Sequence, residues 1–223
     1  MKFRSVFDII GPVMLGPSSS HTAGAVRIGQ IARKLFGQEP DRLTIHLFGS
    51  VAKTYKGHAT DVAVVGGLLN MEVADEALPN SIHIAQERGI SVRFIAEEEI
   101  PDHPNTVKIL MEKGSDSLEA TGISVGGGAV QITEYAGFPI RLSGDFPTLL
   151  ILHHDAYGAI SQVSQLLEKH EINIAHMEVS RLAKGEVALM LIETDALLSP
   201  PILQDIGRRK HVIRASLLAL DEI

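Results

Sequence analysis

Cysteine is absent from the 223-residue sequence. This absence excludes structural disulfides, thiolate nucleophiles, and zinc or iron–sulfur sites with cysteine ligands within the chain. A function that needs such a cluster therefore requires another chain to hold it.

Long apolar runs and an excess of positive charge are also missing. No apolar run approaches the roughly 18 residues that span a bilayer, and Asp8 and Pro12 make the apolar part of the opening stretch too short for a secretory signal. The 20 basic and 27 acidic residues give a net charge of −7 without a basic stripe. We therefore expect a cytoplasmic protein with neither a nucleic acid nor a membrane as its partner.

The first part of the chain alternates helix and strand patterns. Apolar residues at three- and four-residue spacing predict a helix over His21–Phe36, and Gly37 suits its C-cap. A strand follows in "DRLTIHLFGS", and a second helix begins near Thr60 or Asp61. Further strands flank a glycine-rich connection between Ser124 and Gln131. This mixture predicts an α/β (α+β) domain over residues 1–145.

The Gly-, Asp- and Pro-containing stretch "RLSGDFPT", residues 141–148, indicates a domain boundary. Residues 148–223 then read as strand, helix, strand, strand, helix and strand. This order is the ferredoxin-like βαββαβ arrangement, with a four-stranded antiparallel sheet and two helices on one face. We expect Ile160, Val163, Leu166 and Leu167 to form the buried face of the first helix.

The stretch "GPSSSHTAGAVRIG", residues 16–29, places hydroxyl groups and an imidazole at a helix start. A helix N-terminus offers free backbone N–H groups and a partial positive charge, which together bind anions. A single serine there would be explained as an N-cap. Because Ser18, Ser19, Ser20 and Thr22 exceed what capping needs, we expect a binding site for a carboxylate or phosphate. His21 adds a group that exchanges protons near neutral pH.

Two other polar turns have the same character. "YKGHATD" places His58 and Thr60 before an apolar helix, and "DHPNTV" places His103 and Asn105 around a proline. Each could be an ordinary polar loop, but three such turns beside a glycine-rich segment are expected to converge on one pocket.

Other motifs are incomplete. "FGSVAKT", residues 48–54, lacks the spacing of a phosphate-binding P-loop, and "VGGGAVQ" lacks the third glycine of a dinucleotide fingerprint. No histidine cluster has partners at metal-ligand spacing, so we expect no metal site. A hydrolase that uses Ser19 or Ser20 with His21 is a weak alternative because no G-x-S-x-G motif is present.

Four segments together support a family resemblance. "GPSSSHTAGAVRIG", "LFGSVAKTYKGHATDVAVVGGL", "HPNTV" and "SVGGGAVQI" resemble, in order, the β chain of bacterial iron–sulfur-dependent L-serine dehydratases. The C-terminal part resembles an ACT domain, a module that often binds amino acids. The resemblance implies that the first domain is similar to the allosteric-substrate-binding domain of some phosphoglycerate dehydrogenases.

This resemblance also implies an activity and its partners. L-Serine would be converted to pyruvate and ammonia together with an α chain, whose cysteines hold a [4Fe–4S] cluster, and this chain alone would be inactive. His21 would transfer a proton or contact the substrate, with Ser18, Ser19, Ser20, Thr22, His58, Thr60, His103 and Asn105 in binding or supporting roles. Potassium activation is compatible with the resemblance. The alternative is a non-catalytic regulatory subunit that senses small acids.

For the ACT part, the turn "HDAYG", residues 154–158, is where such modules contact ligand. Asp155, Tyr157 and Gly158 are therefore candidate effector-binding residues, whereas the simpler interpretation makes Asp155 the N-cap of the following helix. Edge-to-edge pairing of such modules would cover an exposed sheet edge and predicts a homodimer.

Overall fold

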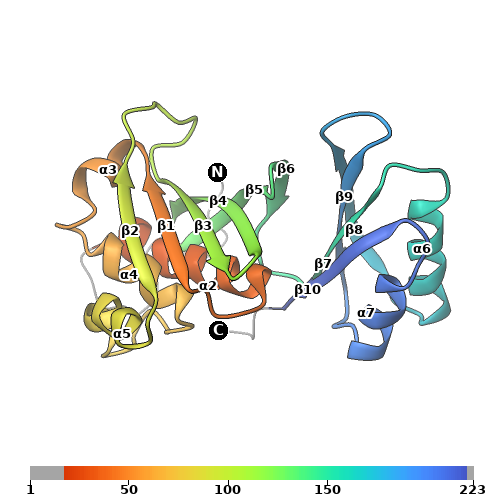
Figure 1. Ribbon diagram of the computed structural model, residues 1–223, viewed down its shortest axis with the longest axis horizontal. Coiled ribbons are helices and arrows are strands. Elements are labelled where there is room, and N and C mark those ends of the chain that lie inside the picture. Colours follow the sequence, from red (N-terminus) through yellow and green to blue (C-terminus); the bar gives the residue numbers. More distant parts are fainter. Residues whose placement is uncertain (1–17, 220–223) are drawn as a thin grey trace. The chain divides into compact units, whose positions relative to one another are not determined.

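A computed structural model describes residues 18–219 (Figure 1). The chain divides into two compact units. The first runs to Ala136 and includes Arg141–Ser143, and the second holds Gly137–Ile140 and the chain from Gly144 on. The expected mixed α/β class is confirmed for the described residues.

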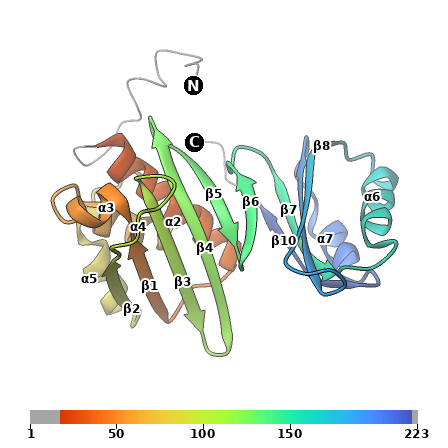
Figure 2. The same cartoon turned by 90° about the horizontal axis from the view of Figure 1, so that it is seen from above.

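The first unit is built on a six-stranded mixed sheet. In chain order its elements are a π-helical turn Ser19–Ala23, α2 (Gly24–Phe36), β1 (Arg42–Leu47), α3 (Gly49–Thr54), α4 (Thr60–Leu68), a 3₁₀ turn Leu78–Asn80, α5 (Ser81–Glu87), β2 (Ser91–Ala96), β3 (Thr106–Lys113), β4 (Asp116–Gly126), β5 (Ala129–Tyr135) and β6 (Phe138–Leu142), whose first three residues belong to the second unit. The strand order is β2-β1-β3-β4-β5-β6, as Figure 2 shows. β1 and β2 are parallel, and the β1–β3, β3–β4 and β4–β5 pairs are antiparallel.

Helix α2 confirms most of the predicted helix. It ends at Phe36, and Gly37 adopts the left-handed conformation, with φ 80° and its N–H bonded to the Arg33 carbonyl. Ala25 and Ile28 are buried among the residues that face β3, β4 and β5. The start differs, because a π turn over Ser19–Ala23 precedes the α-helix, and Ser18 is its N-cap. This π turn contains His21, the predicted catalytic residue.

Two short elements were not predicted. Helix α3 has six residues, fewer than an apolar periodicity needs to be visible. Strand β6 contains Pro139 and follows a two-residue turn in which Ala136 and Gly137 both have positive φ. Proline lowers the strand signal, because it cannot donate to a ladder.

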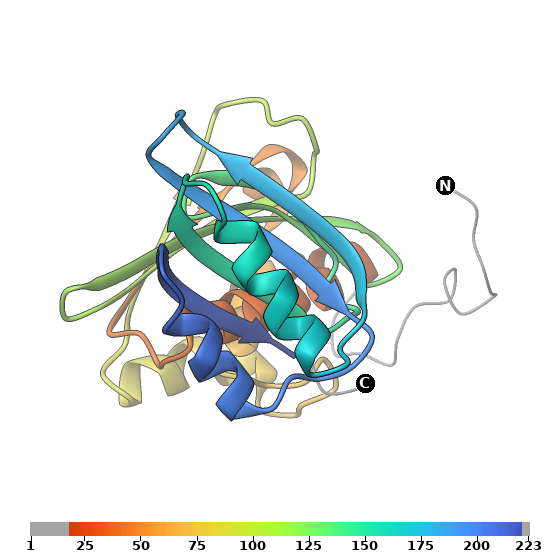
Figure 3. The same ribbon diagram turned by 90° about the vertical axis from the view of Figure 1, so that its right-hand side faces the viewer.

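The second unit confirms the predicted βαββαβ order. Its elements are β7 (Thr148–His154), α6 (Ala159–Lys169), β8 (Ile174–Arg181), β9 (Val187–Thr194), α7 (Pro200–Gly207) and β10 (Val212–Leu218). The sheet is antiparallel in the order β10-β7-β9-β8. Figure 3 shows α6 and α7 on the same face of this sheet.

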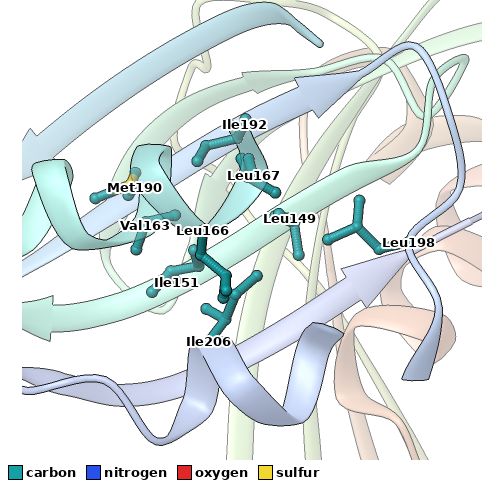
Figure 4. Close-up of a cluster of buried hydrophobic side chains, with 9 residues drawn as sticks. All are labelled: Leu149, Ile151, Val163, Leu166, Leu167, Met190, Ile192, Leu198 and Ile206. Atoms are coloured by element: carbon teal, nitrogen blue, oxygen red, sulfur yellow. The ribbon is translucent and has the colours of Figure 1, made fainter. Parts of the chain in front are cut away.

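An apolar cluster joins the two helices of this unit to its sheet (Figure 4). Its buried members are Leu149, Ile151, Val163, Leu166, Leu167, Met190, Ile192, Leu198 and Ile206. Val163, Leu166 and Leu167 therefore occupy the predicted buried face. The expectation for Ile160 was wrong: its side chain is 45% exposed, because it lies in the first turn of α6 beside a surface cavity.

Candidate functional site

The π turn at Ser19–Ala23 begins the candidate site. The Ser18 hydroxyl oxygen accepts the His21 backbone N–H at 3.2 Å, and the Ser18 carbonyl accepts that of Thr22 at 2.8 Å. Within residues 18–219, the backbone N–H groups of Ser19 and Ser20 have no acceptor. Single π turns are frequently found at functional sites, and N–H groups at a helix start that the described residues leave without an acceptor suit an anion.

The His21 ring lies between two hydroxyl groups. Nδ1 is 3.1 Å from the Ser18 Oγ, and Nε2 is 3.3 Å from the Ser50 Oγ. Ser50 belongs to α3 and was not among the predicted site residues. The described side-chain bonds of His21 go to Ser18 and Ser50, not to Ser19 or Ser20. His21 is therefore not placed to activate Ser19 or Ser20 as the nucleophile of a hydrolase.

A glycine brings α3 against the loop between β2 and β3. Gly49 has φ +58°, and a Cβ there would lie 2.6 Å from the Pro104 carbonyl oxygen. This close approach lets the Ser50 N–H donate to the same carbonyl at 2.8 Å. In Figure 1, α3 and this loop lie at the same edge of the sheet. Glycine is therefore needed at position 49 for Ser50 to reach His21.

Asn105 connects Ser50 to the sheet. The Ser50 hydroxyl donates to the Asn105 Oδ1 at 2.6 Å, and the Asn105 Nδ2 donates to the Ser124 carbonyl at 3.4 Å. His103 supports this residue from the other side, because its Nδ1 accepts the Asn105 backbone N–H at 3.2 Å. His103 thus positions Asn105 and has no described contact with His21.

His58 is the second histidine at the site. Its ring centroid is 4.8 Å from that of His21 in an edge-on arrangement, and its carbonyl accepts the Thr22 hydroxyl at 3.1 Å. The next residue, Ala59, has φ 58°, which is unfavourable for a residue with a Cβ. His58 Nδ1 is buried and has no described partner. The strained turn holds this imidazole beside His21 at the start of α4.

The structure therefore brings together some of the predicted site residues. Ser18, His21, Thr22, His58 and Asn105 form one connected cluster. Thr60 is 1% exposed and its hydroxyl has no described partner, so no described hydrogen bond connects it to His21. The glycine-rich segment forms the turn between β4 and β5. Ser124, just before it, contacts Asn105 with both backbone groups: its N–H donates to the Asn105 carbonyl at 3.0 Å, and its own carbonyl accepts the Asn105 Nδ2. Ser50 lies in "LFGSVAKT", a stretch that contributes to the family resemblance but does not by itself point to a contact with His21.

The surroundings of His21 hold its pKa below the ordinary value of 6.5. Burial of the ring is the larger cause, and repulsion from a protonated His58 is the second. His21 is therefore neutral at neutral pH and can accept a proton. Because the unfolded chain protonates this residue first, its contribution to stability is present above pH 6.5 and is lost as the pH falls below that value.

Replacing His58 with glutamine tests the second cause. We expect the His21 pKa to rise in the His58→Gln variant, while remaining below its ordinary value because burial persists. NMR titration of the imidazole protons measures this directly. The matched control is His83→Gln, which removes an exposed imidazole of α5 that pairs with Glu87. An unchanged or lower His21 pKa in the His58 variant would show that His58 exerts no such repulsion.

A second candidate site lies in the ACT-like unit. A cavity of about 660 Å³ is lined by the turn before α6, by Ile160, and by Arg181 and Lys184 of the β8–β9 hairpin. Asp155, Tyr157 and Gly158 all line it. Within this wall, the Asp155 carboxylate accepts the Gly185 N–H at 2.9 Å and contacts the Arg181 guanidinium at 3.1 Å.

The interpretation of Asp155 as the N-cap of α6 was wrong. Gly158 occupies that position, with φ 84° and no side-chain cap. The carboxylate bonds the hairpin instead, and the hydrogen bonds from Gly185 and then Arg181 lower its pKa. Asp155 therefore holds the β8–β9 hairpin against the turn.

Potential metal ligands and the length of the helices are two further features of the described part of the chain. Among residues 18–219, no group of three His, Cys, Asp or Glu side chains could hold a metal ion. The same part of the chain contains no helix long and apolar enough to cross a membrane.

Comparison with known proteins matches both units. Residues 5–135 match the family model "Serine dehydratase beta chain", and residues 147–210 match "ACT domain". The chain is 51% identical to the probable L-serine dehydratase beta chain of Bacillus subtilis (strain 168), over 98% of this chain and 100% of that protein. It is 36% identical to the L-serine dehydratase beta chain of Peptoniphilus asaccharolyticus, over 86% and 87% of the two chains.

A more distant relative covers both units as well. The D-3-phosphoglycerate dehydrogenase of Synechocystis sp. (strain ATCC 27184 / PCC 6803 / Kazusa) is 29% identical over 92% of this chain and 38% of that protein. The expected likeness to phosphoglycerate dehydrogenases is thereby confirmed. With the family model matching more than half of the chain and two relatives above 30% identity, the chain belongs to the family of L-serine dehydratase beta chains.

Proposed function

We propose that this chain is the beta subunit of a cytoplasmic L-serine dehydratase and acts with an alpha chain to convert L-serine to pyruvate and ammonia. Residues 1–145 would form the serine dehydratase domain and residues 148–223 the ACT domain. Pairing of ACT domains along the β8 edge, where Val179 is 41% exposed, belongs to the same proposal. The family membership and the cluster around His21 support it.

The reaction sets three requirements. The substrate carboxylate must be held, the proton on Cα must be removed, and the β-hydroxyl must leave as water. The aminoacrylate that results then takes up water and releases ammonia to give pyruvate. A beta subunit can meet the first two requirements with its own side chains and backbone.

The π turn is suited to bind the carboxylate of the substrate. The N–H groups of Ser19 and Ser20, for which residues 18–219 provide no acceptor, and the helix dipole of α2 favour a negative charge at this end. The hydroxyls of Ser18, Ser19, Ser20 and Thr22 line the same turn, Asn105 in the loop before β3 reaches it through Ser50, and we assign Thr60 at the start of α4 a supporting role. These binding roles are part of the proposal.

His21 is suited to remove the proton from the substrate Cα. The single observation that carries the proposal is a partly buried imidazole with a lowered pKa, held by hydroxyls on both nitrogens at this anion-binding helix end. Such a group is neutral at the working pH and can accept the Cα proton as a general base. His58 would disfavour the protonated form of the base and so help it to release the proton afterwards.

The iron–sulfur cluster does not fit this chain. The sequence has no cysteine, and the described residues offer no alternative set of metal ligands. We assign the cluster, and with it the departure of the hydroxyl group, to the alpha chain. No step of the chemistry derived for His21 passes through it.

Anaerobic co-expression with an alpha chain tests the proposal. We expect the two chains to purify together and to form pyruvate from L-serine, and we expect neither chain to do so separately. Pyruvate is measured by coupled reduction with lactate dehydrogenase. Full activity of the alpha chain by itself would contradict the proposal.

A regulatory subunit is the second candidate. The observation that favours it is the ACT cavity, which Arg181 and Lys184 line together with Asp155, Tyr157 and Gly158. The two cations could bind an amino-acid carboxylate, and the other three residues would complete the effector site. Under this alternative the complex would respond to effector amino acids, but changes at His21 would leave its turnover unaffected.

A further inference from the structure

The Ser50 hydroxyl has three possible hydrogen-bond partners but only one proton to donate. It lies 2.6 Å from the Asn105 Oδ1, 3.2 Å from the Pro104 carbonyl oxygen and 3.3 Å from the His21 Nε2. A hydroxyl donates one hydrogen bond and accepts up to two. Where its single proton goes therefore decides what His21 must do.

The proton goes to Asn105. The 2.6 Å contact is the shortest of the three, and the Pro104 carbonyl is already bonded by the Ser50 backbone N–H at 2.8 Å. The orientation of the Asn105 amide is fixed as well, because its nitrogen faces the Ser124 carbonyl at 3.4 Å. A flipped amide would place two carbonyl oxygens against each other. Oδ1 therefore faces Ser50 as an acceptor.

With its proton directed to Asn105, the Ser50 oxygen can only accept from His21. Nε2 must then carry the proton of the neutral imidazole, and Nδ1 must be bare. The Ser18 hydroxyl is compatible with this arrangement, because it can donate to Nδ1 at 3.1 Å while its oxygen accepts the His21 backbone N–H. Each hydrogen bond in the chain Ser124–Asn105–Ser50–His21–Ser18 then has one donor and one acceptor.

We propose that Ser50 is a positioning residue that holds His21 in the Nε2–H tautomer, so that Nδ1, on the side of Ser18, is the basic nitrogen. The consequence for catalysis rests on the proposed function. The Cα–H bond of serine would break toward Nδ1, its electron pair would form the Cα–Cβ double bond, and the β-hydroxyl would leave with the electron pair of the Cβ–O bond as hydroxide, which then takes the proton from Nδ1 to give water. The imidazolium formed would keep its Nε2–H bond to Ser50.

The tautomer of His21 can be measured by NMR in this chain without the alpha chain. Multiple-bond ¹H–¹⁵N correlation spectra of histidine-labelled protein distinguish Nδ1–H from Nε2–H, and the His21→Gln variant assigns the His21 signals. We expect the wild-type chain above pH 6.5 to carry the proton on Nε2. Loss of the hydroxyl in Ser50→Ala should reduce the ratio of the two tautomers about fivefold, the effect of one hydrogen bond.

Two further variants keep the test specific. Ser50→Thr retains a hydroxyl and should retain the wild-type tautomer, and Ser91→Ala, at an exposed position of β2, should change nothing. In the assembled enzyme, we expect Ser50→Ala to lower kcat about tenfold with little change in KM, and Ser50→Thr to restore most of it.

A wild-type His21 protonated on Nδ1, or an unchanged ratio in a folded Ser50→Ala variant, would overturn the inference. If Ser50→Ala failed to fold, the wild-type and Ser50→Thr spectra would still test the inference, because both must show the Nε2–H tautomer of His21. If the assembled chains lacked lyase activity but the tautomer were as expected, the proposed function would fail and the role of Ser50 toward His21 would stand.

Discussion

Serine turnover is expected to fall at least about a hundredfold when His21 is replaced by alanine in the assembled enzyme, because a positioned general base contributes 10²–10⁴-fold to rate. The His21 side chain is only partly buried and packs at the start of α2, so its loss should leave the fold and assembly intact. Pyruvate formation by the purified complex gives kcat and KM.

The control for this variant is His83→Ala, which removes an exposed imidazole on α5. We expect it to turn over serine like the unaltered complex. Near-normal turnover in an assembled His21→Ala complex would remove His21 from the catalytic residues and would favour the regulatory interpretation.

Replacing Gly67 with alanine should destabilise the first unit strongly. Helices α2 and α4 cross in backbone contact: a Cβ on Gly67 would lie 2.0 Å from the Val26 carbonyl oxygen, and a Cβ on Gly29 would lie 2.4 Å from that of Val64. Neither carbonyl can move without breaking its helix. We expect the free energy of unfolding to fall by about 3 kcal/mol, the upper end for overpacked cores.

This crossing also matters for the site. Helix α2 carries His21 at its start, and α4 begins two residues after His58, so a shift of the helices would separate the two rings. Urea unfolding followed by far-ultraviolet circular dichroism measures the loss. Gly57→Ala is the matched control, because its nearest neighbour would be an ordinary 3.7 Å away, and its effect should stay within about 0.5 kcal/mol. Equal stability of the two variants would contradict the close crossing.

The sequence predicted the fold where local patterns were long. The amphipathic α2, the antiparallel strands and the βαββαβ order all rest on periodicities of seven residues or more, and the structure confirms them. Short elements such as α3 and β6 escaped, because tertiary contacts rather than local pattern define them. Gly158, not Asp155, begins α6, since the hairpin at Gly185 competes for the carboxylate.

The candidate site could be predicted only in part. Hydroxyls and imidazoles at the helix start indicated an anion site, and the structure places His58 and Asn105 beside it. Ser50 could not be found in this way, because its role depends on Gly49 letting α3 touch the loop at Pro104. A contact between residues more than fifty positions apart leaves no local signal.

Removal of the serine α-proton by His21 is tested most directly by a deuterium isotope effect. Turnover of L-serine and of its α-deuterated form is compared in complexes that carry the wild-type chain or the His21→Gln variant. We predict a larger isotope effect on kcat/KM in the variant, because proton removal then limits the rate. An unchanged isotope effect together with a raised KM would contradict this role and leave His21 as a residue that only binds the substrate.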